Sequence, residues 1–139
     1  MATNRTVNIT IPTQSDPVPV MSVFSWIIIH QRLGLTFNWY RPWADYKAGF
    51  GSVDADFWLG LEKMHLLTSS QPYRLRVEVQ QDSTNLWFSA EYWSFQIGDQ
   101  YWSRSVRSVM STGHSRSVTS STTNIDWKLT ATAETPAMH

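Results

Sequence analysis

The sequence predicts an α+β fold with a short N-terminal sheet, two short helices, an antiparallel β-hairpin or sheet, and a polar C-terminal tail. Apolar and polar residues alternate over residues 73–80, as in a strand with one buried and one wet face. Helix start and stop signals bracket two segments between residues 42 and 69. Residues 103–123 are rich in Ser and Thr and poor in large apolar groups, so we expect them outside the core.

The N-terminal sheet is predicted from two segments. Val7, Ile9 and Ile11 alternate with polar residues, which indicates a half-buried strand after a flexible N-terminus at residues 1–6. Residues 26–29 form an apolar run rich in β-branched side chains and bounded by polar residues. Such a run suits a central strand that is buried on both faces.

Two short helices are predicted in the middle of the chain. Pro42 can open the first, because its fixed φ suits the first helical turn. Gly49 and Gly51 are expected to end it, since glycine suits the conformation at a helix C-terminus. The apolar residues of the segment 56–69 partly follow helical spacing, and the second helix is expected to begin after Gly60.

A β-hairpin is the clearest local prediction. The strand at residues 73–80 is followed by turn residues at 81–85 and by an aromatic-rich strand region at 86–97. The Ser/Thr-rich tail spans residues 103–139. One edge strand is expected in it at residues 125–129, where large apolar residues alternate with polar ones again.

The composition excludes several classes of protein. Lys plus Arg and Asp plus Glu number 11 each, so the chain lacks the basic surface that binds nucleic acid. There is no cysteine, which excludes disulfides and thiolate catalysis and taken alone favours a reducing compartment. No apolar run approaches the length of a membrane helix, and no signal peptide is visible at the N-terminus.

Six segments, in order and with nearly correct spacing, resemble one known family. They read IPTQSDPVPV at 11–20, IIHQR at 28–32, FNWYRPWADYKAGFG at 37–51, DFWLGLEKMHLLT at 56–68, YRLRVEV at 73–79 and EYWSFQIG at 91–98. Together they resemble the N-terminal half of fibrinogen-related domains, and within that family they are closest to the microfibril-associated glycoprotein type. The resemblance makes residues 7–102 a partial fibrinogen-like domain.

The resemblance implies a non-enzymatic recognition or matrix module outside the cell. Members of the family bind glycans, acetyl groups or matrix proteins, and these are the expected partners here. Nothing after Trp102 resembles the half that carries the family's calcium site and ligand pocket. We therefore expect no cofactor, and the family's ligand residues cannot be carried over. The alternative is a structural or non-functional truncated remnant, or a designed fragment, with no ligand.

Aromatic residues are the expected core, because large rings bury the most apolar surface. Several of them are expected to clamp the two helices onto the sheet. The predicted core residues are Trp26, Trp43, Tyr46, Phe50, Phe57, Trp58 and Tyr73.

Other candidate sites lie on the predicted surface. Asn4 and Asn8 each begin an N-x-T glycosylation motif. Arg74 and Arg76 share the wet face of their strand, where a solvated face is the plainer interpretation and a partner surface the alternative. Exposed tryptophans, notably Trp87 and Trp93, would complete such a surface and would also favour self-association. The histidines lack metal-ligand spacing, and no catalytic constellation is visible.

Overall fold

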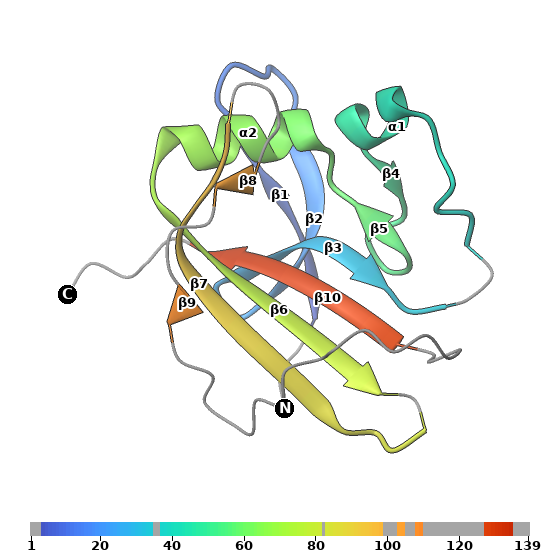
Figure 1. Cartoon of the computed structure of the whole chain (residues 1–139). Helices are drawn as coiled ribbons and strands as arrows, with labels where there is room; N and C mark the ends of the chain where they lie inside the picture. The colour runs from blue at the N-terminus through green and yellow to red at the C-terminus, as the bar shows by residue number, and fades with distance from the viewer. Residues whose placement is uncertain are drawn as a thin grey trace.

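An antiparallel sheet and two helices make up the computed structural model, which describes residues 4–34, 37–81, 83–98, 103–104, 108–109 and 127–134. This arrangement confirms the predicted α+β class (Figure 1). The elements are β1 (Arg5–Ile9), β2 (Val18–Val23), β3 (Trp26–Arg32), α1 (Trp43–Ala48), β4 (Phe50–Gly51), β5 (Phe57–Trp58), α2 (Leu61–Ser70), β6 (Tyr73–Gln81), β7 (Trp87–Ile97), β8 (Ser103–Arg104), β9 (Ser108–Val109) and β10 (Trp127–Glu134).

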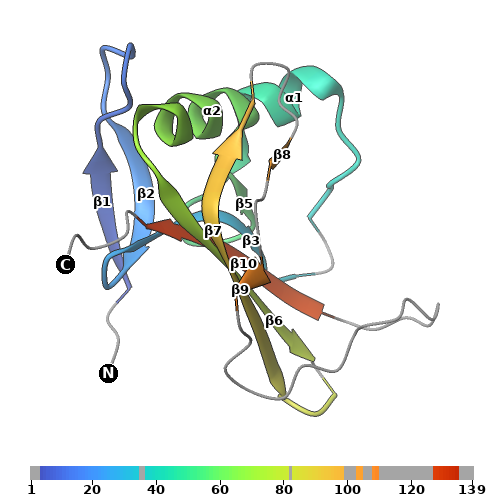
Figure 2. The same ribbon diagram turned by 60° about the vertical axis from the view of Figure 1, so that its left-hand side comes forward.

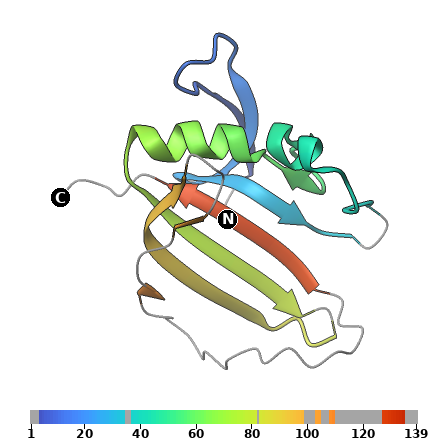
Figure 3. The same cartoon turned by 45° about the horizontal axis from the view of Figure 1, so that its top comes forward.

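Strand β10 lies in the middle of the sheet, between β3 and β6, in the order β1-β2-β3-β10-β6-β7-β8 (Figure 3). Ala131 pairs with His30 on one side and with Val77 on the other, both antiparallel. The strand predicted at residues 125–129 is confirmed by β10 for residues 127–129, but its predicted edge position is wrong because β10 is central. Residues 127–134 also belong to the sheet and not to the predicted polar tail, while residues 125 and 126 lie outside the described residues. A central strand is stabilised by backbone pairing along both of its edges, so it does not need large side chains.

The N-terminal strand begins earlier than expected. Arg5 and Thr6 pair with Ser22 and Met21 of β2, so these two residues belong to the sheet and not to the flexible N-terminus predicted at residues 1–6. β1 and β2 form a hairpin at one end of the sheet (Figure 2). Residues 1–3 lie outside the described residues, as do Trp102 and most of the predicted tail.

Both helices form where the sequence predicts them. α1 follows Pro42 and ends at Gly49, and α2 follows Gly60. α2 packs across one face of the sheet (Figures 1 and 3). A small apolar gap is lined by both layers, with Met64 and Leu67 from the helix facing strand residues of the sheet. The strand residues around this gap are Ile27, Ile29, Tyr73, Phe95 and Ala133.

The short strands β4 and β5 are not predicted by the sequence. Phe50 pairs with Trp58, and Trp58 also pairs with His30 of β3, so this two-strand unit attaches α1 to the edge of β3. Because each strand has only two residues, neither leaves a readable period in the sequence. The unit brings several aromatic rings together beside β3.

Candidate interaction surfaces

A cluster of rings, here called the aromatic clamp, joins β3, the loop before α1, α1 itself and the β4–β5 unit. Its members are His30, Phe37, Trp39, Tyr46, Phe50 and Trp58. Centroid distances between neighbouring rings run from 5.0 Å for His30 and Trp39 to 6.0 Å for Phe37 and Phe50. Most pairs meet edge to face, which is a favoured arrangement for aromatic rings.

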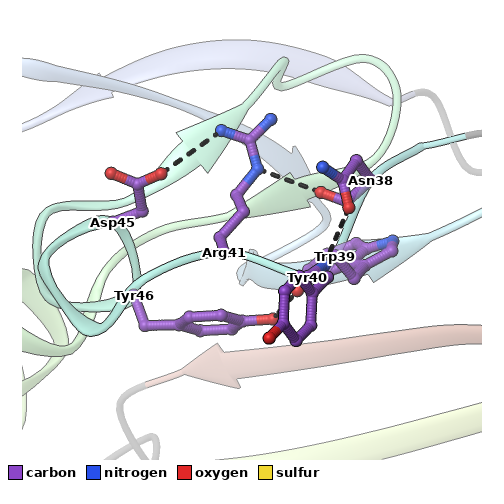
Figure 4. A network of polar contacts seen from close by, with 6 residues as sticks. All are labelled: Asn38, Trp39, Tyr40, Arg41, Asp45 and Tyr46. Atoms are coloured by element: carbon purple, nitrogen blue, oxygen red, sulfur yellow. Dashed lines mark hydrogen bonds and ion pairs between the residues drawn. The ribbon is translucent and has the colours of Figure 1, made fainter.

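Hydrogen bonds hold the clamp in one arrangement. The Tyr46 hydroxyl donates to the carbonyl oxygen of Trp39, and Trp58 Nε1 donates to the carbonyl oxygen of Tyr46 at 2.8 Å. Arg41 Nε donates to the carbonyl oxygen of Asn38 at 3.0 Å (Figure 4). The loop from residue 38 to residue 41 is thus tied to α1 by side chains on both segments.

Arg41 also contacts two rings of the clamp, which stack on each other beside it. Its Cζ is 5.1 Å from the centroid of Phe37 and 4.7 Å from that of Phe50. One of its terminal nitrogens lies 3.6 Å from a carboxylate oxygen of Asp45, as Figure 4 shows. The guanidinium therefore has both a cation–π and an ionic partner on the same small unit.

Two glycines let α1 and the start of α2 approach closely. A Cβ at Gly49 would lie 2.3 Å from the carbonyl oxygen of Leu59, and one at Gly60 would lie 2.7 Å from backbone atoms of Ala48. Both residues have positive φ, at 101° and 108°. The segments 37–51 and 56–68 therefore need glycine at these two positions, because no other residue fits both the backbone conformation and the space.

Asp56 organises the chain next to the clamp. Its buried carboxylate accepts hydrogen bonds from the backbone N–H groups of Leu33 and Gly34, just after β3. A carboxylate so engaged is a structural acceptor for a loop. Sequence patterns assign Asp56 no such role, because the groups that it binds lie more than twenty residues away along the chain.

The imidazole of His30 is enclosed within the clamp. Its pKa is lowered from 6.5 to about 4, chiefly by burial and also by the charge of Arg32, while the charge of Asp56 opposes the change. Its ring lies 5.0 Å from Trp39 and 5.1 Å from Trp58. His30 is therefore neutral at physiological pH and acts as a packing residue.

A second set of arginines and rings lies on the face of the sheet that is turned away from α2 and is here called the outer patch. It consists of Trp26, Arg74, Arg76, Glu78, Glu91 and Trp93. Ile27 and Tyr73 face α2, so their strand neighbours Trp26 and Arg74 point to the other side. The Cζ of Arg74 lies 5.2 Å from the Trp26 ring and 4.9 Å from the Trp93 ring.

The outer patch also carries balanced charge. Arg76 Nε lies 3.1 Å from a carboxylate oxygen of Glu78 and 3.6 Å from one of Glu91. Each of these three side chains is about one third exposed, and Trp93 is 37% exposed. The patch therefore presents aromatic surface and both signs of charge to the solvent together.

Of the predicted partner residues, the structure brings three together. Arg74, Arg76 and Trp93 all belong to the outer patch. Trp87 does not, because it pairs with Gln80 near the hairpin turn, at the other end of β6. Trp87 is 58% exposed and follows Leu86, which is also exposed.

The predicted core residues fall into three groups. Phe57 and Tyr73 are buried. Trp26, Tyr46, Phe50 and Trp58 are half-buried. Trp43 is 60% exposed, so its assignment to the core is wrong. As the first residue of a short helix that buries no residue of its own, it lies at the rim of the domain.

Tyr40 is an exposed ring that the sequence patterns do not single out. It is 97% exposed and lies three residues before Trp43. Its backbone N–H donates to Asn38 Oδ1 at 3.0 Å, so the backbone that presents the ring is held in place (Figure 4). An open cleft of about 630 Å³ lies elsewhere, between the turn at residues 13–19 and the β4–β5 unit, with Lys63 on its wall.

No group of three or more metal-binding side chains occurs within the described part of the chain. Neither α1 nor α2, the helices that the structure describes, has the length and apolarity needed to cross a membrane. The predicted glycosylation acceptors, Asn4 and Asn8, are both exposed on the N-terminal strand segment.

Comparison with known proteins places these features in a family. The family model for the fibrinogen beta and gamma chains, C-terminal globular domain, matches residues 21–128. Microfibril-associated glycoprotein 4 of Homo sapiens is 40% identical over 88 residues, covering 60% of this chain and 34% of that protein. Fibrinogen-like protein A of Apostichopus parvimensis is 41% identical over 76 residues, covering 55% of this chain and 27% of that protein.

Solved structures agree with this assignment. The fibrinogen-like globe domain of human ANGPTL2 superposes with a TM-score of 0.72 at 29% identity, over 81% of this chain and 55% of that one. A lamprey fibrin D-dimer complexed with the peptide ligand Gly-His-Arg-Pro-amide superposes with a TM-score of 0.72 at 30% identity. The match covers 77% of this chain and 36% of that one. The chain spans about a third or less of the length of these curated relatives. Because the family model covers more than half of the sequence, the chain belongs to the fibrinogen C-terminal globular domain family.

Proposed function

We propose that this chain is a non-enzymatic recognition module that works outside the cell and binds an extracellular matrix protein through the outer patch. Family membership supports the general role, since one relative is named as a microfibril-associated glycoprotein. The observation that carries the specific proposal is the contact of Arg74 with two tryptophan rings, the half-buried Trp26 and the 37% exposed Trp93, on one face of the sheet.

The composition of the outer patch favours a protein partner. Tryptophan and arginine are the residues most enriched among those that dominate binding energy at protein interfaces. The neighbouring Glu78 and Glu91 hold Arg76 in place, so a partner meets ordered side chains and loses less conformational entropy on binding. Mixed charge favours a surface of complementary mixed charge over a uniformly anionic polymer.

The described residues support the non-enzymatic part of the proposal. The histidine of the clamp is enclosed by tryptophans, and burial lowers its pKa to about 4, which makes it a poor base at neutral pH. The buried carboxylate of Asp56 is occupied by backbone N–H groups. Both of these groups therefore serve the fold.

The ligand is proposed to be a segment of polypeptide. The lamprey fibrin D-dimer, which shares this fold, is complexed with a short peptide. Exposed rings beside arginine and glutamate can bind a peptide through stacking and charge-assisted hydrogen bonds. Glycan binding is the competing outcome, because aromatic rings can also contact sugar rings.

The experiment measures binding of the purified chain to a panel of matrix proteins and to an array of acetylated and unacetylated glycans. Arg74→Ala and Trp93→Ala are each expected to weaken binding to a matrix protein by about tenfold or more. Trp43→Ala is the matched control, since Trp43 is an exposed tryptophan outside the patch. Binding to glycans alone, or an equal loss in the control, would contradict the proposal.

A second candidate function is a structural module that associates with itself. Leu86 and Trp87, adjacent and exposed at the hairpin turn, favour it. Light scattering with size-exclusion chromatography distinguishes the two functions. A dimer that is lost in Trp87→Ser, with no binding to the panel, would replace the recognition proposal.

A further inference from the structure

The N-terminal strand segment carries two neighbouring glycosylation motifs, Asn4-Arg-Thr6 and Asn8-Ile-Thr10. Both asparagines and both threonines of the motifs lie at even-numbered positions. Because side chains alternate along a strand, all four are expected on the same face. From Thr6 onwards the burial follows the same period: Thr6, Asn8 and Thr10 are exposed, whereas Val7 and Ile9 are half-buried against the core. Every group that the modifying enzyme recognises therefore lies at an exposed position.

The same strand is the end of the sheet. β1 pairs with β2 along one edge, and among the described residues no strand pairs with its other edge. A free edge offers unpaired backbone N–H and C=O groups to another chain. Proteins usually protect such an edge with charge, proline or a bulge.

β1 has one of these protections, the exposed Arg5 at its start, and lacks the others along the rest of its length. Residues 6–11 read TVNITI, a segment without charge, proline or glycine in which every residue except Asn8 is Val, Ile or Thr. This composition is the signature of segments that pair into cross-β assemblies. The chain as a whole has zero formal net charge, so charge repulsion between copies is weak.

We propose that Asn8 carries an N-linked glycan, that Asn4 is a second acceptor, and that the glycan on Asn8 shields the free edge of β1 from pairing with another chain. A bulky hydrated glycan performs here the role that lysine or proline performs on other edge strands. Asn8 pairs with Pro19 of β2, an exposed residue, so the neighbouring strand leaves the acceptor open.

The modification itself rests on the extracellular part of the proposed function, because it requires passage through the secretory pathway. The side-chain Nδ2 of Asn8 attacks the anomeric carbon of a lipid-linked oligosaccharide. A new C–N bond forms, the bond from the sugar to the lipid diphosphate breaks, and the amide releases one proton. The co-reactant is thus the oligosaccharide donor, and no oxidant or reductant is needed.

The occupancy test expresses the chain behind a cleavable secretion leader in eukaryotic cells and measures its intact mass before and after peptide N-glycosidase. Asn8→Gln and Thr10→Ala are each expected to remove one glycan, since Thr10 supplies only the hydroxyl of the motif. Asn85→Gln, at an exposed asparagine outside any such motif, is the control and should change nothing. A wild-type mass that the enzyme leaves unchanged would overturn the proposal.

The shielding test compares glycosylated and enzymatically deglycosylated protein by light scattering and thioflavin fluorescence. Aggregation is expected to be several-fold faster after deglycosylation. In the bare protein, Thr6→Lys should slow it again, because it places a charge on the same exposed face. Equal aggregation of all three samples would overturn the shielding role.

The two proposals fail separately. A secreted, folded chain that binds a matrix protein but carries no glycan contradicts only the modification. A glycosylated chain that binds nothing on the panel contradicts only the recognition function.

Discussion

The aromatic clamp and the outer patch each hold an arginine in contact with two aromatic rings, yet the two sites have different surroundings. Arg41 contacts the stacked rings of Phe37 and Phe50, and its Nε donates to the carbonyl oxygen of Asn38. Arg74 contacts Trp26 and Trp93 on the face of the sheet turned away from α2. The first arginine joins the loop before α1 to the β4–β5 unit, and the second lies beside Trp93, which is 37% exposed.

The difference shows that an arginine–aromatic pair has no fixed role. In the clamp, the guanidinium contacts two rings, the carbonyl oxygen of Asn38 and the carboxylate of Asp45, so its interactions contribute mainly to folding. On the outer patch, Trp93 is 37% exposed and keeps surface that a partner can still cover. The comparison predicts that changes in the clamp lower stability, whereas changes in the outer patch lower binding.

The largest expected effect comes from removing the close approach that supports the clamp. Gly49→Ala places a Cβ 2.3 Å from the carbonyl oxygen of Leu59 and forces an alanine into positive φ. We expect a loss of about 3 kcal/mol or more in the free energy of unfolding, measured by urea denaturation. Gly34→Ala is the control, because its nearest atom lies 3.9 Å away, and it should change stability by less than about 1 kcal/mol.

A pH dependence is the next effect. Because folding lowers the pKa of His30 to about 4, the unfolded chain takes up a proton below pH 6.5 while the folded chain does not. The stability from His30 is complete above pH 6.5 and declines as the pH falls towards 4. Between pH 7 and pH 5 we expect a loss of about 2 kcal/mol.

Urea denaturation at pH 7 and pH 5 measures this loss, and His30→Phe is the matched variant because its ring cannot titrate. The variant should show a smaller dependence on pH than the wild type over this range. If the free energy of unfolding changes equally with pH in the variant and the wild type, the clamp does not enclose His30.

A paired substitution tests the comparison directly. Arg41→Ala is expected to lower the free energy of unfolding by about 1–2 kcal/mol, through its lost ring contacts and hydrogen bond. Arg74→Ala should lower it by less than about 1 kcal/mol, because cation–π contacts at exposed sites are weaker. Denaturation midpoints of the two variants measure the difference. An equal or larger loss for Arg74→Ala would make the outer patch part of the structural core.

The smallest expected effect concerns Trp43. Because this ring is 60% exposed, Trp43→Ala should destabilise the chain by less than about 1 kcal/mol. Thermal unfolding followed by circular dichroism is sufficient to measure it. Phe57→Ala is the comparison variant, since removal of a buried phenylalanine typically lowers the free energy of unfolding by about 3–5 kcal/mol. If both variants lose similar stability, Trp43 contributes to the core after all and its exposed position in the structure is contradicted.

Patterns with a short period were read correctly from the sequence. The alternation in β6, the proline before α1 and the glycine before α2 each mark a local conformational preference. The motifs between residues 37 and 98 led to the correct family for the same reason, because each lies within one short stretch of chain. The alternation of β6 placed Arg74 and Arg76 on one wet face, and their role as partner residues stays a prediction.

The errors arose where a residue's role depends on distant neighbours. The burial of Trp43 was inferred from the average preference of tryptophan, but α1 buries none of its own residues. Asp56 was missed because the N–H groups that it binds belong to the chain after β3. Nothing in the sequence indicates that Trp87 lies apart from Arg74, which only the register of β6 and β7 shows.

The sequence alone determined the α+β class, the positions of both helices, the β6–β7 hairpin and the family, because these depend on local conformational preference and on motifs within single segments. Only the tertiary structure decided that β10 enters the sheet between β3 and β6 and that Arg41 and Arg74 have different surroundings. A strand finds its partners through backbone groups that every residue carries, so side-chain patterns do not show which strands will pair.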